Sequence, residues 1–174
     1  MFKHDNLYMR AIEEADLEPL RQLHNHPSTL SQLTDPTFVT PAMQRRWFAG
    51  LGGGASRRYV IVEVGDSADA PVAMVRIDQL DHRHGNACIG LDVAVKRRGE
   101  GLGTRALQLL LAYCFEQLNL QMVWLWTRES NKIAQGMYRK LGFNACGRLP
   151  GAIYRDGKYG DLLLMSLARP EVMR

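Results

Sequence analysis

Hydrophobic residues in the first third of the chain are spaced as in a short strand followed by two helices. Loose alternation at residues 7–12 predicts the strand. Asp16 then stands where the N-cap of a helix is expected, before leucines at 17, 20 and 23. Thr40 and Pro41 are typical of a second helix start, and the glycines at 52–54 are expected to end that helix.

Three apolar, β-branched stretches follow. They cover residues 59–64, 72–80 and 87–95, and turn-forming residues lie between them. We expect three strands in an antiparallel meander.

The second half of the chain alternates between helical and strand patterns. Apolar residues at 107, 110, 111, 114 and 118 predict a helix over 104–118, and a wholly apolar stretch at 122–127 predicts a buried strand. Ser130 is expected to cap a helix whose apolar side, from Ile133 to Leu141, is followed by Gly142. Two final strands, at 143–149 and 162–167, flank a turn at 156–157.

This order of elements predicts one α/β (α+β) domain over residues 1–174. We expect a mixed, mostly antiparallel sheet with helices on both faces. The strands at 87–95 and 122–127, joined by one helix, should form a parallel, right-handed βαβ unit at its centre.

Composition excludes several classes of protein. The chain has 174 residues, 46% hydrophobic and 23% charged, which indicates a soluble globular protein. The longest apolar stretch, residues 109–115, is too short for a membrane span, and the N-terminus lacks an apolar signal core, so we expect a cytoplasmic protein without a membrane partner. Three scattered cysteines favour neither a disulfide framework nor a metal site.

The net charge of +4 suits a phosphorylated ligand as well as nucleic acid. Interleaved aromatic and basic motifs are missing from the sequence, and we therefore expect no nucleic-acid partner.

A glycine-rich turn between a predicted strand and a predicted helix is the main candidate binding site. Residues 97–104 read RRGEGLGT, with glycines at alternate positions and arginines at 97, 98 and 105 that add positive charge. Such a turn lets the backbone approach a ligand, and the following helix directs free N–H groups into it, which favours a phosphate. The spacing matches neither the P-loop nor the dinucleotide fingerprint.

Two motifs resemble the GNAT superfamily of N-acetyltransferases. Arg98, Gly101 and Gly103 are similar to its Arg/Gln-x-x-Gly-x-Gly/Ala motif. Residues 131–143, NKIAQGMYRKLGF, are similar to its N-x-x-A-x-x-x-Y-x-K-x-G-F element. Within the superfamily, residues 155–161 resemble the branch of ribosomal-protein N-terminal and spermidine acetyltransferases, and residues 25–27 resemble acetyltransferases acting on nucleotide-linked amino sugars.

The resemblance implies acetyl-CoA as co-substrate and a primary amine as acceptor. The pyrophosphate would be held by the glycine turn, namely by Arg98, Gly99, Gly101, Leu102, Gly103 and Thr104. The pantetheine arm would lie in a gap between the two parallel strands, against the edge that includes Val93 and Val95, and Asn131 would contact it. Tyr138 would protonate the leaving thiolate.

The general base is harder to assign, because Cys88 stands where many members of the superfamily have glutamate. Asp92 lies on the same face of the predicted strand and is our first candidate base, although an ion pair with Arg76 is an equal alternative. Glu129, and a pair of histidines at 82 and 84, are further candidates.

Without a strong base, an acceptor of low amine pKa is favoured. We therefore expect a small-molecule amine or a nucleotide-linked amino sugar, with the acceptor pocket formed by residues 24–47 and the final hairpin. A peptide N-terminus, as in ribosomal-protein acetyltransferases, and a catalytically silent acyl-CoA sensor are the alternatives. The C-terminal strands are compatible with a homodimer.

Overall fold

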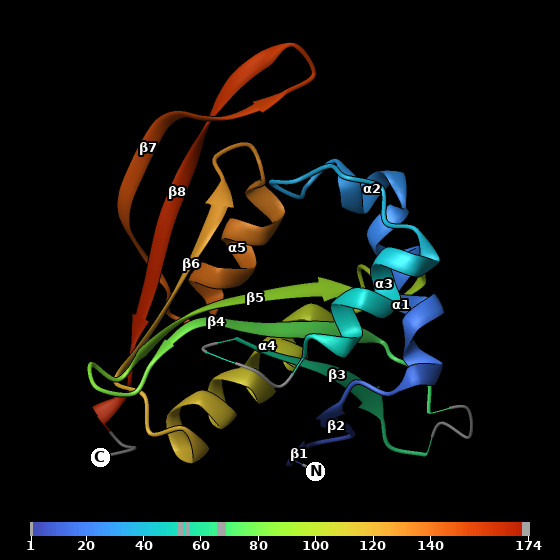
Figure 1. Cartoon of the computed structure of the whole chain (residues 1–174). Coiled ribbons are helices and arrows are strands. Elements are labelled where there is room, and N and C mark those ends of the chain that lie inside the picture. The colour runs from blue at the N-terminus through green and yellow to red at the C-terminus, as the bar shows by residue number, and fades with distance from the viewer. Residues whose placement is uncertain (1, 52–53, 55, 66–68, 172–174) are drawn as a thin grey trace.

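The computed structural model describes residues 2–51, 54, 56–65 and 69–171. Their strands form one eight-stranded sheet in the order β1-β2-β3-β4-β5-β6-β8-β7 (Figure 1). The strands are β1 (Phe2–His4), β2 (Leu7–Ala11), β3 (Arg57–Glu63), β4 (Ala73–Asp81), β5 (Asn86–Val93), β6 (Met122–Arg128), β7 (Asn144–Arg155) and β8 (Lys158–Ala168). Neighbouring strands are antiparallel except β5 and β6, which are parallel. The predicted fold class is confirmed.

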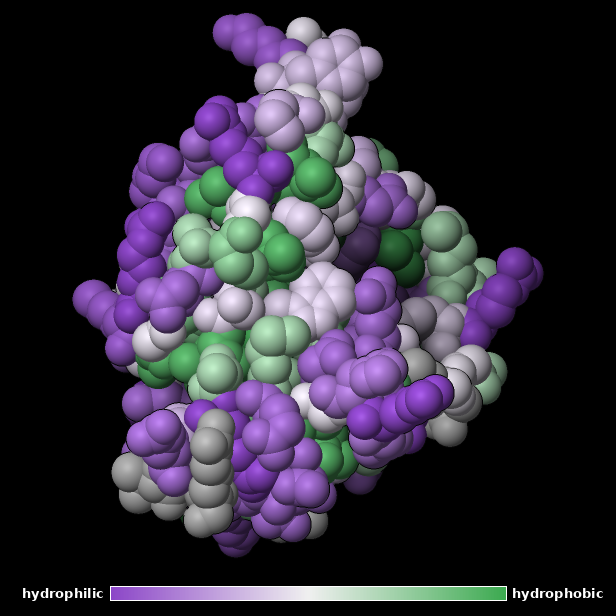
Figure 2. Space-filling view, turned by 90° about the vertical axis from the view of Figure 1, so that its left-hand side faces the viewer, coloured by the Kyte–Doolittle hydropathy of each residue, from purple (hydrophilic) through white to green (hydrophobic). Residues whose placement is uncertain are grey.

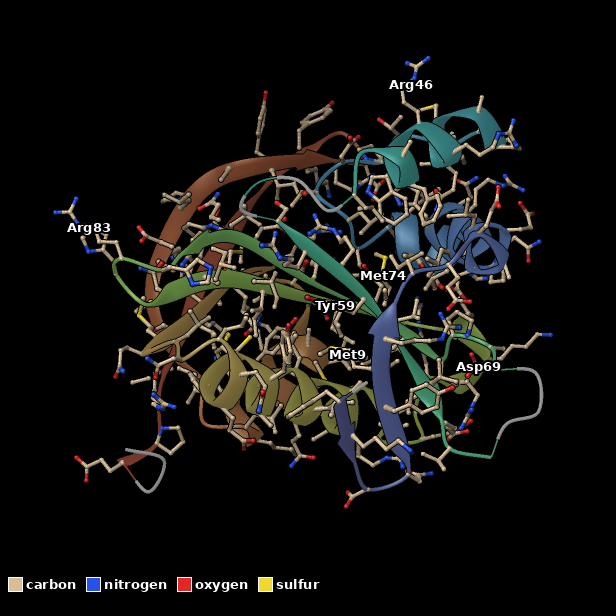
Figure 3. The ribbon with its side chains drawn as sticks, turned by 60° about the horizontal axis from the view of Figure 1, so that its bottom comes forward. Met9, Arg46, Tyr59, Asp69, Met74 and Arg83 are labelled. Atoms are coloured by element: carbon tan, nitrogen blue, oxygen red, sulfur yellow. The ribbon has the colours of Figure 1, made fainter. Side chains whose placement is uncertain are left out.

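Helices cover both faces of the sheet. They are α1 (Leu17–Asn25), α2 (Pro27–Leu30), α3 (Pro41–Ala49), α4 (Leu102–Ala112) and α5 (Lys132–Lys140), with short helical turns η1 (Glu14–Asp16), η2 (Val95–Arg97) and η3 (Tyr113–Gln117). Side chains alternate between the faces, so Met9 and Tyr59 point toward α4, whereas Met74 packs on the side of α1 and α3 (Figure 3).

The larger core lies between the sheet and α4. Val75 and Ile77 of β4 and Leu107 and Leu110 of α4 are completely buried there. Burying a leucine side chain stabilises a fold by about 1.5–3 kcal/mol, so α4 is held mainly by this apolar face. It fixes the glycine turn against the sheet, because the turn leads directly into α4.

The parallel strands β5 and β6 pair over only three residue pairs. These are Asn86 with Met122, Ala87 with Val123, and Cys88 with Trp124. Beyond them β5 stays paired with β4 as far as Val93, while β6 stays paired with β8 as far as Arg128. The two strands therefore separate toward their carboxyl ends, as the resemblance implied.

Several predicted helix boundaries were wrong. The helix expected over 104–118 begins at Leu102 and continues beyond Ala112 as the π-helical turn η3. The second helix ends at Ala49, one residue before Gly50, rather than at 52–54; residues 52 and 53 lie outside the described residues. Strand β1 and helix α2 were not predicted.

Two predicted helix caps also differ. The Asp16 carboxylate makes no side-chain cap to α1; it pairs with Arg10 at 2.6 Å. The N-terminus of α5 is capped by Asn131, not by Ser130, because the Asn131 side-chain oxygen accepts the Ala134 N–H at 3.1 Å.

The C-terminal hairpin is much longer than predicted. β7 has 12 residues and β8 has 11, and together they project beyond the rest of the molecule (Figures 1 and 2). Tyr154 and Tyr159 pack together at the end of this hairpin, with ring centroids 5.0 Å apart, and both stay largely exposed.

Candidate active site

A cleft of about 860 Å³ opens where β5 and β6 separate. Its walls come from β4, β5, the glycine turn, β6, α5, β8 and residues 28–34, which we call the wall segment. Nine residues predicted for the site line it: Asp92, Val93, Arg98, Gly99, Gly101, Gly103, Thr104, Asn131 and Tyr138.

The glycines of the turn have distinct structural roles. Gly99 and Gly101 have φ angles of +87° and +73°, in the left-handed region that favours glycine, and a Cβ on either would face open space. A Cβ on Gly103 would lie 3.2 Å from the sulfur of Met137 and 3.4 Å from Cγ2 of Val93, so this glycine lets α4 approach α5 and β5. The first N–H groups of α4 are therefore presented to the cleft in the arrangement that binds anions.

Arg98 connects the glycine turn to the wall segment. Its guanidinium donates to the carbonyl oxygen of Val93 at 3.1 Å, to Oγ of Ser28 at 2.8 Å and to Oγ1 of Thr29 at 2.6 Å. One side chain thus connects the end of β5 with helix α2. Thr29 and Ser28 of this helix are 69 and 70 residues away from Arg98 along the sequence.

The two other arginines near the turn do not line the cleft, contrary to our expectation. Arg97 donates to Glu63 at 2.8 Å and to Glu100 at 2.9 Å. Arg105 donates to Asn6 at 2.6 Å and lies 3.9 Å from Glu63. The hydrogen bond from Arg97 holds the pKa of Glu63 below its usual value. These arginines are bound to protein groups that anchor the turn.

Two of the predicted cofactor contacts are placed elsewhere. Leu102 is 1% exposed and belongs to the core, so only its backbone could serve a ligand. Val95 lies in η2, after the end of β5, and does not line the cleft. Asn131 does line it, with its side-chain oxygen used as the helix cap.

Tyr138 lies in the floor of the cleft on α5. Its ring packs against Phe143, with centroids 5.7 Å apart, and the side chain is buried. Burial raises the pKa of its phenol above the ordinary value of 10.0. The hydroxyl is therefore protonated at neutral pH and able to give a proton to a leaving group.

Asp92 is ion-paired with Arg76, which was the alternative to its role as a base. The Nη1 and Oδ2 atoms are 2.8 Å apart. Gly90, which faces Arg76 in the strand register, makes room for this contact, since a Cβ there would lie 2.4 Å from Cζ of Arg76. Beside them, burial raises the pKa of the Cys88 thiol to about 11, so the thiol stays protonated at neutral pH.

The remaining candidate bases do not line the cleft. Glu129 pairs with Arg148 of β7 at 3.4 Å. His82 and His84 lie exposed in the turn between β4 and β5, at the end of β5 opposite to the glycine turn.

The wall segment lies within residues 24–47, which we expected around the acceptor, but its helix and the contacts that hold it were not predicted. Besides Arg98, it is held by Arg128 of β6, which donates to the Ser31 carbonyl, and by Arg155 of β7, which donates to the Leu33 carbonyl. Its short helix begins at Pro27, and that proline after His26 was the one local signal available. Arg76, Trp126, Arg128, Lys132 and Lys140 are further lining residues that were not predicted.

In the described residues, no helix is both long and apolar enough to cross a membrane. Within the same part of the chain, histidine, cysteine and acidic side chains form no group of three that could hold a metal ion.

Comparison with known proteins identifies the family. The model of the acetyltransferase (GNAT) domain matches residues 6–144. The chain is 28% identical over 160 residues to spermidine N(1)-acetyltransferase of Escherichia coli (strain K12), covering 91% of this chain and 84% of that protein. It is 29% identical over 128 residues to putative ribosomal N-acetyltransferase YdaF of Bacillus subtilis, covering 73% of this chain and 66% of that protein.

A solved structure shows the same fold. The spermidine N-acetyltransferase from Vibrio cholerae in complex with CoA and spermine matches with a TM-score of 0.85 at 23% identity, covering 94% of this chain and 95% of that one. Because the family model spans most of the sequence, and the sheet separates between the two strands that precede the two motifs, the chain belongs to the GNAT family of N-acetyltransferases.

Proposed function

We propose that the protein transfers the acetyl group of acetyl-CoA to the primary amine of a small molecule, by direct attack of the amine on the thioester. The observation that carries this proposal is the cleft between the separated strands, which joins a glycine turn suited to phosphate to a buried, protonated tyrosine.

The described residues fit acetyl-CoA. No other group crowds the turn at Gly99 and Gly101, where a Cβ would face open space, and a glycine turn before a helix N-terminus suits a pyrophosphate. The edge of β5 at Val93, which is not paired with β6, offers backbone groups to an extended amide-containing arm. In this proposal an N–H of this edge stabilises negative charge on the thioester oxygen, and Tyr138 protonates the departing sulfur.

Proton removal from the amine limits the acceptor. At pH 7, deprotonating a lysine-like amine with a pKa of about 10.4 costs about 4.6 kcal/mol, whereas an α-amine with a pKa near 8 costs about 1 kcal/mol. Among the described residues that line the cleft, Asp92 is the one carboxylate, and its charge is paired with Arg76. We therefore favour an acceptor of low amine pKa, such as an amino sugar, over a polyamine.

The test is release of free thiol from acetyl-CoA with a panel of amino sugars, nucleotide-linked amino sugars, peptides with free N-termini and spermidine. Tyr138→Phe keeps the ring packing against Phe143 and removes the hydroxyl, so we expect kcat to fall by roughly 10²–10⁴ with little change in thermal stability. An unchanged kcat would refute the role of Tyr138. Acetyl-CoA binding without thiol release from any acceptor would favour the sensor alternative.

A peptide N-terminus is the second candidate acceptor, because YdaF is named as a putative ribosomal N-acetyltransferase. If the protein acetylates peptides and not the small amines, this second candidate would replace our first proposal. The homodimer through β7 and β8 stays a prediction, to be checked by sedimentation, and so does the cytoplasmic location.

A further inference from the structure

Positive charge dominates the side chains that line the cleft. Arg76, Arg98, Arg128, Lys132 and Lys140 contribute five cations, whereas Asp92 is the single carboxylate among the lining residues that the structure describes. A cofactor that carries phosphates accounts for part of this excess, so the question is which cations are left over for the acceptor.

Four of the five cations are accounted for by an ion pair or by their position in or beside the glycine turn. Arg76 is neutralised by Asp92 at 2.8 Å. Arg98 belongs to the glycine turn through its bond to Val93. Lys132 and Lys140 are on α5, the helix that packs against that turn where Met137 lies next to Gly103, and we assign their charges to the cofactor phosphates.

Arg128 is the remaining cation, and it lies on the acceptor side. Side chains of β6 alternate, so Arg128 shares a face with Trp126 and Trp124, and the register of Trp124 with Cys88 places Asp92 of β5 on that same face. This face of β5 and β6 is opposite to the one that packs on α4, because Ile89, Val123 and Leu125 of the other parity belong to the α4 core.

The guanidinium of Arg128 is only partly used by the protein. Nη1 donates to the Ser31 carbonyl of the wall segment, and no carboxylate of the described residues pairs with Arg128. A guanidinium has five N–H donors in a planar fork that matches a carboxylate or a phosphate. Arg128 and the partly exposed Trp126 both line the cleft, and the guanidinium has donors besides the one that contacts Ser31.

We infer that the acceptor is an amine that carries an anionic group, a carboxylate or a phosphate, and that Arg128 binds this group beside Trp126. This inference rests on the proposed function and narrows its substrate. A polyamine would bring several positive charges to a wall that holds an unpaired arginine and one already paired carboxylate, so spermidine should be a poor acceptor.

The experiment compares matched acceptors that differ in an anionic group and have similar amine pKa values. The carboxylate pair is glycyl-leucine with glycyl-leucinamide, the phosphate pair is glucosamine 6-phosphate with glucosamine, and spermidine is the cationic member. We expect kcat/KM to be at least tenfold higher for the anionic member of one pair, mostly through KM. That pair tells whether the acceptor's anion is a carboxylate or a phosphate.

Two arginine variants make the test specific. Arg128→Gln should reduce the ratio of kcat/KM between the anionic and the neutral member to about one. Arg83→Gln removes the same charge from the exposed turn between β4 and β5, where Arg83 points away from the protein (Figure 3) and does not line the cleft, and should keep the wild-type preference. The wild-type preference should also weaken as salt is added.

Several results would overturn the inference. Equal kcat/KM within both pairs, or spermidine as the best acceptor, would refute it even though thiol release would still support the proposed function. An equal loss on anionic and neutral acceptors in Arg128→Gln would show that Arg128 only supports the wall segment. If no acceptor releases thiol, the proposed function itself fails, and this inference with it.

Discussion

The glycine opposite Arg76 offers a sharp test of how the cleft is built. In Gly90→Ala, the new Cβ would lie 2.4 Å from both Cζ and Nε of Arg76, more than an ångström inside ordinary contact. The guanidinium must therefore move, and the 2.8 Å contact with Asp92 breaks. The strand itself tolerates alanine, because Gly90 does not have a positive φ.

The expected change in stability is small because two effects oppose each other. Alanine in place of glycine inside a strand stabilises by roughly 0.5–1 kcal/mol. Loss of a partly exposed ion pair costs about 0.2–1 kcal/mol. The unfolding free energy should stay within about 1 kcal/mol of wild type, which is a shift in Tm of at most about 4 °C for a chain of this size.

Activity should respond far more than stability. With the guanidinium displaced at the acceptor side, we expect kcat/KM for the amine to fall at least tenfold and KM for acetyl-CoA to stay within twofold, as measured by thiol release. The control is Gly160→Ala in β8, where a Cβ would meet Ile153 at an ordinary 3.6 Å. A kcat/KM equal to wild type in Gly90→Ala would refute the placement of Arg76. A loss of several kcal/mol in the unfolding free energy would show that the strand backbone itself requires glycine at this position.

Three further predictions concern the glycine turn. Gly101→Ala forces a side chain into the left-handed region at φ +73°, so it should cost about 1–2 kcal/mol in thermal unfolding and raise the acetyl-CoA Kd measured by calorimetry; wild-type values would contradict the role of the turn. Because Arg97 lowers the pKa of Glu63 in the folded state, this pair stabilises the fold above the ordinary pKa of 4.5 and the contribution is lost as the pH falls through the lowered value. Glu63→Gln should thus be less stable than wild type at pH 7, and the difference should vanish in acid; a difference that persists at low pH would refute the assignment. Arg98→Met and Thr29→Val should be non-additive by more than about 0.5 kcal/mol in urea unfolding, and additive values would show that their 2.6 Å contact carries no energy.

The parts of the site that the sequence predicted are those encoded by short spacings. The glycine turn, Asn131 and Tyr138 lie within continuous motifs, so their types and intervals are visible without knowing the fold. The fold class was predictable for a similar reason, since the strand and helix periods change at turn residues. A local pattern cannot tell which of two adjacent arginines lines the cleft, as Arg97 and Arg98 show.

The parts that were missed depend on contacts between distant segments. The wall segment is fixed by arginines from the glycine turn, β6 and β7, and Arg128 lies 97 residues from Ser31. The length of β7 was missed because its residues are exposed at nearly every position, which leaves no alternation to recognise beyond Pro150. Whether Asp92 is free or paired was left open, because the answer depends on Gly90. This residue of β5 faces Arg76 of β4 and leaves room for the Arg76 side chain to reach Asp92.

The exposed edge of β7 has a consequence for the behaviour of the protein at high concentration. A long unpaired strand edge can recruit strands from other molecules and start aggregation. Here the edge is interrupted by Pro150, which has no N–H to offer, and by register shifts between Ala145 and Gly147 and between Leu149 and Ile153. Such breaks twist the strand and prevent continuous edge-to-edge pairing. The fold can therefore carry a 12-residue strand at its border without open-ended addition of molecules to the sheet.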